Sequence, residues 1–267
     1  MNNVNIRFYL VVLAVCIFAA PAIAQKQEKK NLFTAGHASA FIGGLYDAYF
    51  PYSQLKLHGD FGLGAPDKLD GELLMLDGKL YQTQASGKTS EIPDTGRTPF
   101  AVVNFFNTDK TFNGPEGQTK DELYAFLDSR LPDKNSVYAI KIKGKFTMVK
   151  TRAFPPVTKK PYAPLASMLS LQKFFSFEHV KGTLVGYRIP AHMEGANISG
   201  YHFHFLSDDK KSGGHIIDLQ TSSVSIEVNH LRSFTIDLPH TDDFRNFDLT
   251  KDRSDEVRRV EIGKEND

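Results

Sequence analysis

The chain has 267 residues, with 32 basic and 31 acidic side chains and a formal charge of +1. No basic run interleaved with aromatic residues occurs, so the composition does not support a nucleic-acid-binding protein. The only cysteine is Cys16 near the N-terminus, which excludes a disulfide scaffold or a thiolate metal site in the rest of the chain. Any transition-metal site there must therefore use nitrogen and oxygen ligands.

The first 24 residues have the three parts of a secretory signal peptide. Residues 1–7 carry one positive charge, residues 8–20 are apolar, and Ala22 and Ala24 are small residues typical of a cleavage site. The apolar run is too short to cross about 30 Å of hydrocarbon, which takes roughly 20 residues. We therefore expect cleavage near Ala24, export to the periplasm or the medium, and no stable membrane anchor.

The first part of the mature chain is predicted to consist mainly of strands. Residues 72–76 and 79–82 flank an Asp-Gly dipeptide, which is typical of a tight hairpin turn. Residues 98–106 form another candidate for a buried strand. The glycine-rich segment 59–64 does not fit the dinucleotide-binding fingerprint, and we interpret it as a turn or bulge.

A helix and a long strand follow. Thr119 and Glu122 have the spacing of a capping box, and the apolar residues behind them predict a helix that stops near Leu131. Residues 137–152 predict a long bent strand or a strand pair, with Gly144 at the bend or turn.

Four prolines between residues 155 and 164 prevent regular structure and indicate a domain boundary. The predicted class is α+β, with an N-terminal mixed β-sheet domain over residues 25–163 and a C-terminal, β-rich, metal-binding domain over residues 164–267. A helix is expected over residues 165–175, and the charged tail from Asp242 is expected to be peripheral. The strands expected in the second half are 183–188, 200–206, 215–220, 223–228 and 233–236.

Three histidines carry the strongest chemical signal. Because side chains alternate along a strand, His202 and His204 in the segment GYHFHFL share one face, roughly 7 Å apart, while the aromatic residues take the other. The polar turn at residues 207–214 returns the chain to a strand that opens with His215, so antiparallel pairing can bring this imidazole beside the first two. Three imidazoles suit Zn²⁺, with other divalent metals possible, and leave an open position for substrate. The remaining histidines lack this geometry and are predicted to be structural or solvated: His37, His58, His179, His192, His230 and His240.

Two charged residues occupy predicted strands that are otherwise apolar. Glu72 shares a face with Leu74, and a buried carboxylate must be paired or have its pKa raised towards neutrality, which suits proton transfer. Arg152 follows Met148 on one face and can grip a carboxylate with its planar fork. The alternative for both residues is an ordinary position at the end of a strand, exposed to solvent or paired for structural reasons.

Together these segments resemble the α-acetolactate decarboxylase family over most of the mature chain. The resemblance implies a zinc site of His202, His204 and His215, with Glu72 and Arg152 reaching it from the first half. It also implies that a glutamate returns to the site from the C-terminal tail, and the matching position is Glu261. The segments that carry the resemblance are 59–64, 69–73, 98–101, 149–152, 161–165, 182–186 and, most specifically, 200–215.

The resemblance further implies the reaction, in which 2-acetolactate (2-hydroxy-2-methyl-3-oxobutanoate) loses CO₂ through a metal-stabilised enediolate and yields acetoin. Arg152 would orient the leaving carboxylate or the developing enediolate, and Glu72 or Glu261 would deliver the proton to one face. No organic cofactor is expected, and the partner is a small-molecule substrate. Members of the family are often dimeric, so a homodimer is possible.

Two departures from the family pattern stand out. Members commonly carry threonine and an aromatic residue where this chain has Ala65 and Pro66, and many have no signal peptide. Two other functions stay open on the residues alone. One is an exported zinc lyase or hydrolase that uses metal-bound hydroxide, and the other is a non-catalytic exported metal-binding protein with a fourth protein ligand.

Overall fold

The computed structural model describes residues 30–262, so the predicted signal peptide lies outside the described residues. Within this range the larger sheet has seven strands in the order β14-β1-β8-β3-β4-β5-β6. Strands β1 and β14 pair in parallel and the other neighbours are antiparallel, so the sheet is mixed. Its strands are β1 Asn31–Ala35, β3 Phe61–Ala65, β4 Glu72–Leu76, β5 Lys79–Thr83, β6 Thr89–Ile92, β8 Phe100–Asn104 and β14 Ser233–Asp237.

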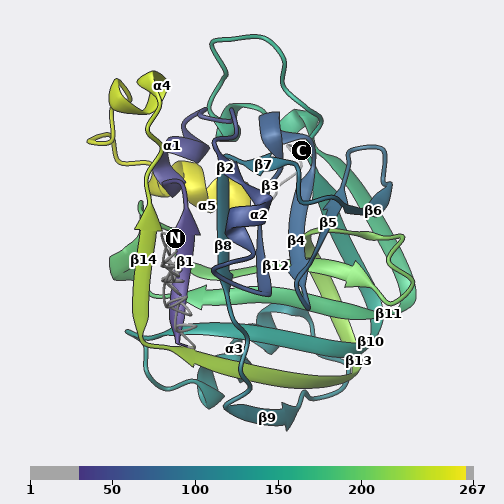
Figure 1. The fold of residues 1–267 in the computed structure, drawn as a ribbon. Helices are drawn as coiled ribbons and strands as arrows, with labels where there is room; N and C mark the ends of the chain where they lie inside the picture. Colours follow the sequence, from purple (N-terminus) through teal and green to yellow (C-terminus); the bar gives the residue numbers. More distant parts are fainter. Residues whose placement is uncertain (1–29, 263–267) are drawn as a thin grey trace, which may run out of the picture.

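The second sheet is antiparallel and consists mostly of long strands. Strands β10 and β12 each pair with both β11 and β13, which closes a circuit of four strands, and β9 extends it beside β13. Figure 1 shows β10, β11 and β13 running across the molecule below the upright strands of the larger sheet. The bounds are β9 Lys110–Asn113, β10 Val137–Ala153, β11 Lys173–Ile189, β12 Gly200–Ser207 and β13 Gly213–Leu231.

Helices are few and short. Of those described, none is both long and apolar enough to cross a membrane. The α-helices are α1 Ala38–Ile42, α2 Tyr52–Leu55, α3 Lys120–Arg130, α4 Asp242–Arg245 and α5 Ser254–Ile262, and the 3-10 turns are η1 Asp67–Leu69, η2 Leu165–Ser167, η3 Leu169–Leu171 and η4 Ala191–Met193. A minor sheet pairs β2 Phe50–Pro51 with β7 Arg97–Thr98.

Strand β4 shows why the sequence folds this way. Its residues are all buried, and successive side chains enter different cores. Leu73 packs in a core on the outer face of the larger sheet. Leu74 points the other way and joins the core between the two sheets, which includes Val185 and Leu206 of the second sheet. Because Glu72 lies two residues before Leu74, its side chain points towards the second sheet.

Several local predictions are confirmed. The β4–β5 hairpin turns at Asp77 and Gly78, whose φ angles of 52° and 73° are the left-handed values that this tight turn requires. The capping box is present, because the backbone N–H of Thr119 donates to Glu122 Oε2 over 2.9 Å and the Thr119 hydroxyl accepts in return. Residues 137–152 form one strand that continues through Gly144.

The helix predicted over residues 165–175 is wrong. Two 3-10 turns occupy its start, and β11 begins at Lys173 because residues 173–175 pair with residues 151–153 of β10. This long-range pairing overrides the helical spacing of the apolar residues.

The turn predicted at residues 59–64 is also wrong, because most of it forms the inner strand β3. A Cβ atom at Gly62 would collide with the carbonyl of Val102, and one at Gly64 with the carbonyl of Phe100. These glycines therefore allow close approach of β8. The two strands expected at 215–220 and 223–228 are one strand, β13.

The two sheets do not follow the division predicted at residue 163. Strands β9 and β10 precede that residue but belong to the second sheet, and β14 follows it but pairs with β1. The chain therefore crosses between the sheets more than once. The tail is less peripheral than its charge indicated, since Val257 and Val260 of α5 are buried in the core between the sheets.

Candidate active site

Three histidines converge where β12, β13 and β10 meet. His202 and His204 lie on one face of β12, and His215, near the start of β13, pairs with His204 on one side and with Arg152 of β10 on the other. The Nε2 atom of His202 is 3.3 Å from Nε2 of His204 and 3.0 Å from Nδ1 of His215. One nitrogen from each ring lies within 4.8 Å of the other two. The alternation of side chains along β12 thus predicted which histidines come together.

The chemistry of these imidazoles fits a cation. The Nδ1–H of His204 donates to the carbonyl of Leu73 over 2.8 Å, so its Nε2 carries a lone pair towards the other rings. Burial lowers the pKa of His204 to about 3, and burial likewise holds the pKa values of His202 and His215 well below their usual range. Neutral nitrogens at such distances repel unless a proton or cation lies between them. Nitrogen–zinc bonds of roughly 2.0–2.1 Å in a tetrahedral site separate two ligand nitrogens by about 3.4 Å, close to the two separations from His202.

Glu72 and Arg152 form a buried ion pair beside the histidines. Glu72 Oε1 is 2.5 Å from Nη1 of Arg152, and Glu72 Oε2 is 3.4 Å from Nε2 of His204. Glu72 is 8% exposed and Arg152 is 3% exposed. Burial raises the pKa of Glu72 to about 7, although the nearby charge of Arg152 opposes this shift. The Nε atom of Arg152 is buried with no hydrogen-bond partner among the described residues.

Glu261 reaches the same place from the tail. Its Oε2 atom, on α5, is 3.8 Å from Nε2 of His215 and 4.0 Å from Nδ1 of His202. Burial raises the pKa of Glu261 to about 7; the charge of Glu72 adds to this shift, and that of Arg152 opposes it. No local pattern indicated this position, which only the family resemblance identified.

These polar groups line one pocket with an empty volume of about 370 Å³, part of it open to solvent. The apolar walls were missed from the sequence, because they come from seven separate segments of the chain. Only Phe154, two residues after Arg152 and just past the end of β10, could have been expected, and the Arg152 guanidinium lies 4.9 Å from its ring centre. Ala65 is one of the wall residues, so the hydroxyl of the family pattern is absent there. The apolar walls are Phe41, Ile42, Ala65, Leu69, Phe100, Phe154, Leu165, Ile198 and Val260.

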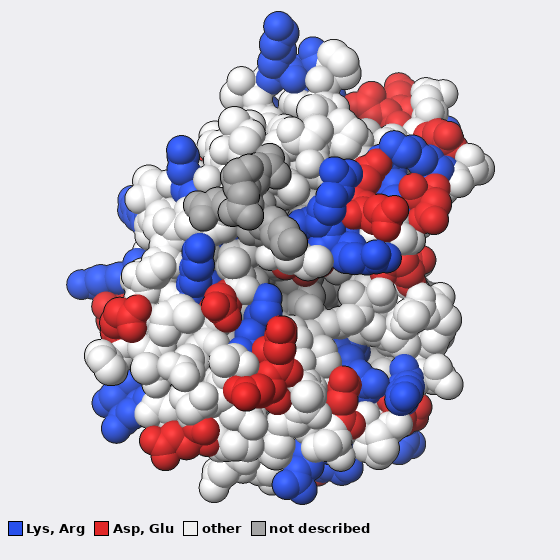
Figure 2. Space-filling model, turned by 180° about the vertical axis from the view of Figure 1, so that it is seen from behind, with Lys and Arg blue, Asp and Glu red and all other residues white. Residues whose placement is uncertain are grey.

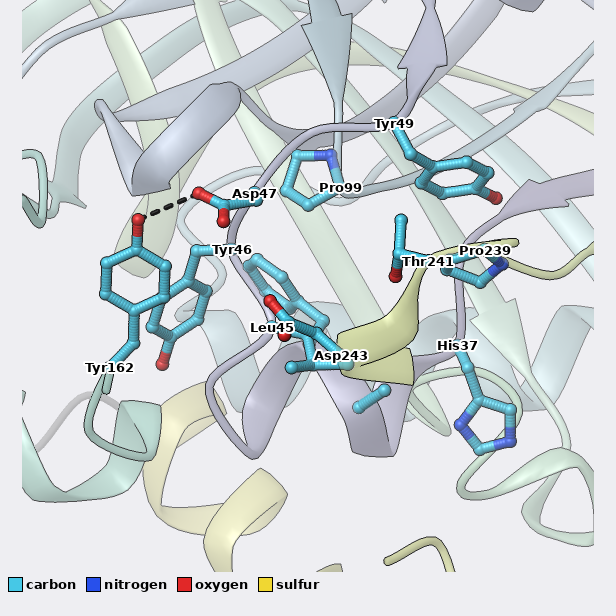
Figure 3. Close-up of a pocket in the computed structure, with 12 residues that line it drawn as sticks. His37, Leu45, Tyr46, Asp47, Tyr49, Pro99, Tyr162, Pro239, Thr241 and Asp243 are labelled. Atoms are coloured by element: carbon cyan, nitrogen blue, oxygen red, sulfur yellow. Dashed lines mark hydrogen bonds between the residues drawn. The ribbon is translucent and has the colours of Figure 1, made fainter. Parts of the chain in front are cut away.

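A second pocket is drawn in Figure 3, and Phe41 lines both pockets. The empty volume of this second pocket is about 550 Å³, again partly open, and it lies between the α1 region and residues 239–243. The Tyr162 hydroxyl donates to Asp47 over 2.8 Å at one end of it. The three histidines, Arg152 and both buried glutamates line the smaller pocket instead, so we take that one as the candidate active site. On the face that Figure 2 shows, basic and acidic side chains are interspersed, so that face presents no uninterrupted basic surface.

The raised pKa values predict how stability depends on pH. An unfolded glutamate loses its proton near its ordinary pKa of 4.5, whereas folded Glu72 keeps it until about pH 7. The unfolded state therefore binds fewer protons between these values, and the free energy of unfolding falls as the pH rises through this window. Histidines with lowered pKa values act oppositely below pH 6.5, but a comparison with Glu72→Gln cancels their contribution. With a metal chelator present, we expect the stability of Glu72→Gln relative to the parent to rise by up to about 3 kcal/mol from pH 4.5 to pH 8.

Urea unfolding of both proteins at several pH values measures this difference. If the difference in unfolding free energy between the two proteins is the same at every pH, the raised pKa of Glu72 is contradicted.

The fold and the site define a class: a two-sheet protein with a few short helices whose one pocket joins three neutral imidazoles, two buried carboxylates and an arginine. The sequence profile described as alpha-acetolactate decarboxylase matches residues 32–251. The chain therefore belongs to the alpha-acetolactate decarboxylase family and is an enzyme of that family. The matched segment contains the histidines, Glu72 and Arg152, and Glu261 follows it.

Individual relatives agree with this assignment. The alpha-acetolactate decarboxylase of Methanosarcina mazei is 40% identical over 230 residues, which cover 86% of this chain and 80% of that protein. That of Brevibacillus brevis is 38% identical over 242 residues, covering 90% and 85%. The crystal structure of alpha-acetolactate decarboxylase from Bacillus subtilis strain 168 matches with a TM-score of 0.83 at 32% identity, covering 86% of this chain and 99% of that one.

Proposed function

We propose that this chain decarboxylates 2-acetolactate to acetoin and CO₂ in the pocket that holds His202, His204 and His215. The observation that carries the proposal is that this pocket combines a site for a cation with a site for an anion. The imidazole nitrogens supply the first, and the guanidinium of Arg152, whose Nε has no hydrogen-bond partner among the described residues, supplies the second. A β-keto acid with a neighbouring hydroxyl needs both sites. Its carboxylate must be held in place while a cation polarises its keto and hydroxyl oxygens.

A single divalent cation, Zn²⁺ in the first instance, would be held by His202, His204 and His215. When bound, it would supply a Lewis acid that polarises the substrate oxygens and stabilises the negative charge that develops as CO₂ departs. The hydrogen bond from His204 to the Leu73 carbonyl orients one of these rings, as partners behind metal-binding histidines usually do.

Arg152 orients the substrate. Its guanidinium is buried, so its charge acts in a low dielectric. Its Nη1 already donates to Glu72, and the Phe154 ring covers one of its faces. The rest of the guanidinium then directs the substrate carboxylate to a defined position. The carbon–carbon bond to that carboxylate breaks, and its electron pair stays on the remaining enediolate.

One of the two glutamates returns a proton to carbon. With pKa values of about 7, Glu72 and Glu261 can both hold a proton near neutral pH and release it on demand. They reach the pocket from different elements, β4 and α5, so a proton from one of them arrives on one face of the enediolate. Acetoin of a single hand is the expected product.

The other two functions account for fewer of these residues. A hydrolase that uses metal-bound hydroxide does not explain the buried ion pair of Arg152 and Glu72. A non-catalytic metal-binding protein gives no reason for an apolar pocket that opens on the histidines.

The test combines metal analysis with an acetoin assay on racemic 2-acetolactate. We expect one equivalent of a divalent metal, release of acetoin and CO₂, loss of turnover with a chelator, and recovery on adding Zn²⁺. Turnover that survives complete removal of metal would contradict the cation. Bound metal without any acetoin would favour the non-catalytic protein.

Export of the protein and its assembly into a homodimer stay predictions. We propose export after cleavage near Ala24 on the pattern of residues 1–24, and N-terminal sequencing of the secreted protein would test it. A homodimer rests on the resemblance alone, and analytical ultracentrifugation would test it.

A further inference from the structure

We propose that Gly43, which follows α1, is a positioning residue for Glu261. Its missing side chain leaves a space that Phe247 and Arg253 fill, and this arrangement, here called the tail contact, sets where α5 presents Glu261. The proposal rests on the catalytic role given above to Glu261.

The tail needs such a contact, because little else holds the segment that leads into α5. Most residues between 238 and 252 are exposed. Lys160 pairs there with Asp47 and Asp243, but these groups are exposed, and surface ion pairs contribute roughly 0–1 kcal/mol. Helix α5 has nine residues, and an isolated helix of that length is unstable in water. Its position must therefore come from tertiary packing. Val257 and Val260 bury one side of α5 in the core between the sheets, and the tail contact holds the end at which the helix begins.

The geometry at Gly43 is specific. A Cβ atom there would collide with Cζ of Phe247 and would lie 2.8 Å from Cζ of Arg253. The φ angle of Gly43 is −78°, which alanine adopts without strain, so the glycine is needed for close approach and not for its backbone. Arg253 is buried, its guanidinium lies 5.2 Å from the centre of the Phe247 ring, and its Nη1 donates to Glu256 Oε2 over 2.7 Å. In Figure 1, α5 lies beside α1, which agrees with these contacts.

The tail contact is directly linked to the active site. Phe41 and Ile42, which precede Gly43, line the same pocket as Val260 and Glu261. Eight residues separate Arg253 from Glu261, which is about 12 Å of helix at 1.5 Å per residue. A tilt of roughly 10° at the tail contact would therefore move the Glu261 carboxylate by about 2 Å, whereas catalytic groups must stay within about 0.5 Å of their productive position.

Gly43→Ala tests the proposal in the full-length, metal-loaded enzyme. We expect amide hydrogen exchange in residues 254–262 to accelerate at least about tenfold, and kcat to fall at least about tenfold, with KM and metal content little changed. In a Glu261→Gln background the same substitution should cause no further loss of kcat, because the group that it misplaces is already disabled. Gly114→Ala is the matched control, since its Cβ would lie 2.6 Å from the Val224 side chain, away from the tail. Gly114→Ala should leave amide hydrogen exchange in α5 unchanged.

Arg253→Ala provides a second test if Gly43→Ala fails to fold. It should likewise accelerate exchange in α5 and lower kcat. Its control is Arg258→Ala on the same helix, which should do neither. The Arg258 side chain is 69% exposed and pairs with the exposed Asp255.

The outcomes separate this proposal from the proposed function. Unchanged exchange in α5 for both Gly43→Ala and Arg253→Ala would overturn the tail contact, whatever the activity. Faster exchange with parental kcat, while Glu261→Gln is impaired, would overturn the positioning of Glu261. If Glu261→Gln itself turns over at the parental rate, the catalytic role of Glu261 fails, and its positioning fails with it.

Discussion

Replacing His204 with asparagine is expected to remove the bound metal and to lower kcat by at least about 10³-fold. A metal acting as a Lewis acid contributes several kcal/mol to the transition state, and each 1.36 kcal/mol is a factor of ten in rate. Asparagine can place its amide nitrogen where the imidazole has Nδ1, so the hydrogen bond to the Leu73 carbonyl can persist while Nε2 is lost. The substitution thus separates metal binding from folding at a residue that is only 1% exposed.

Metal content, acetoin formation and the thermal midpoint should be measured on the same preparation. His192→Asn in the exposed turn η4 is the control, and we expect it to keep both metal and activity. A folded His204→Asn protein that retains one equivalent of metal and parental turnover would show that the three histidines are not the metal site.

Replacing Glu72 with glutamine is expected to lower kcat about 10²- to 10⁴-fold, the range of a lost general acid. Glutamine has the same shape, and its carbonyl oxygen can still accept the hydrogen bond from Arg152. What it loses is the proton that a carboxylic acid with a pKa of about 7 can transfer. Metal content should therefore stay the same while turnover falls. Chiral chromatography of the acetoin measures whether the residual reaction keeps its handedness.

Glu227→Gln is the matched control, because Glu227 is also a strand glutamate paired with a cation, Lys141, but lies outside the pocket. Its turnover should stay within about twofold of the parent. If Glu72→Gln forms acetoin at the parental rate with unchanged handedness, Glu72 is not the proton donor, and Glu261 becomes the remaining candidate.

The sequence by itself determined the features that depend on local chemistry. Alternation along a strand places His202 and His204 on one face whatever the strand packs against, and a polar turn returns His215 to them. The Asp-Gly turn after Leu76 and the capping box at Thr119 follow from backbone preferences of a few residues. Glu72 was noticed because a carboxylate followed by apolar residues is costly to bury, and the structure does bury it against Arg152.

Only the tertiary structure decided which segments meet. Residues 165–175 have helical spacing, yet their last part becomes a strand because the end of β10 offers it a partner. Gly62 and Gly64 resemble a turn until β8 is placed against them. No local pattern marks Gly43 or Glu261, because what they do depends on a tail that folds back across the chain. The periodicity of the sequence indicates the direction of each side chain, but the packing of distant segments determines what that side chain contacts.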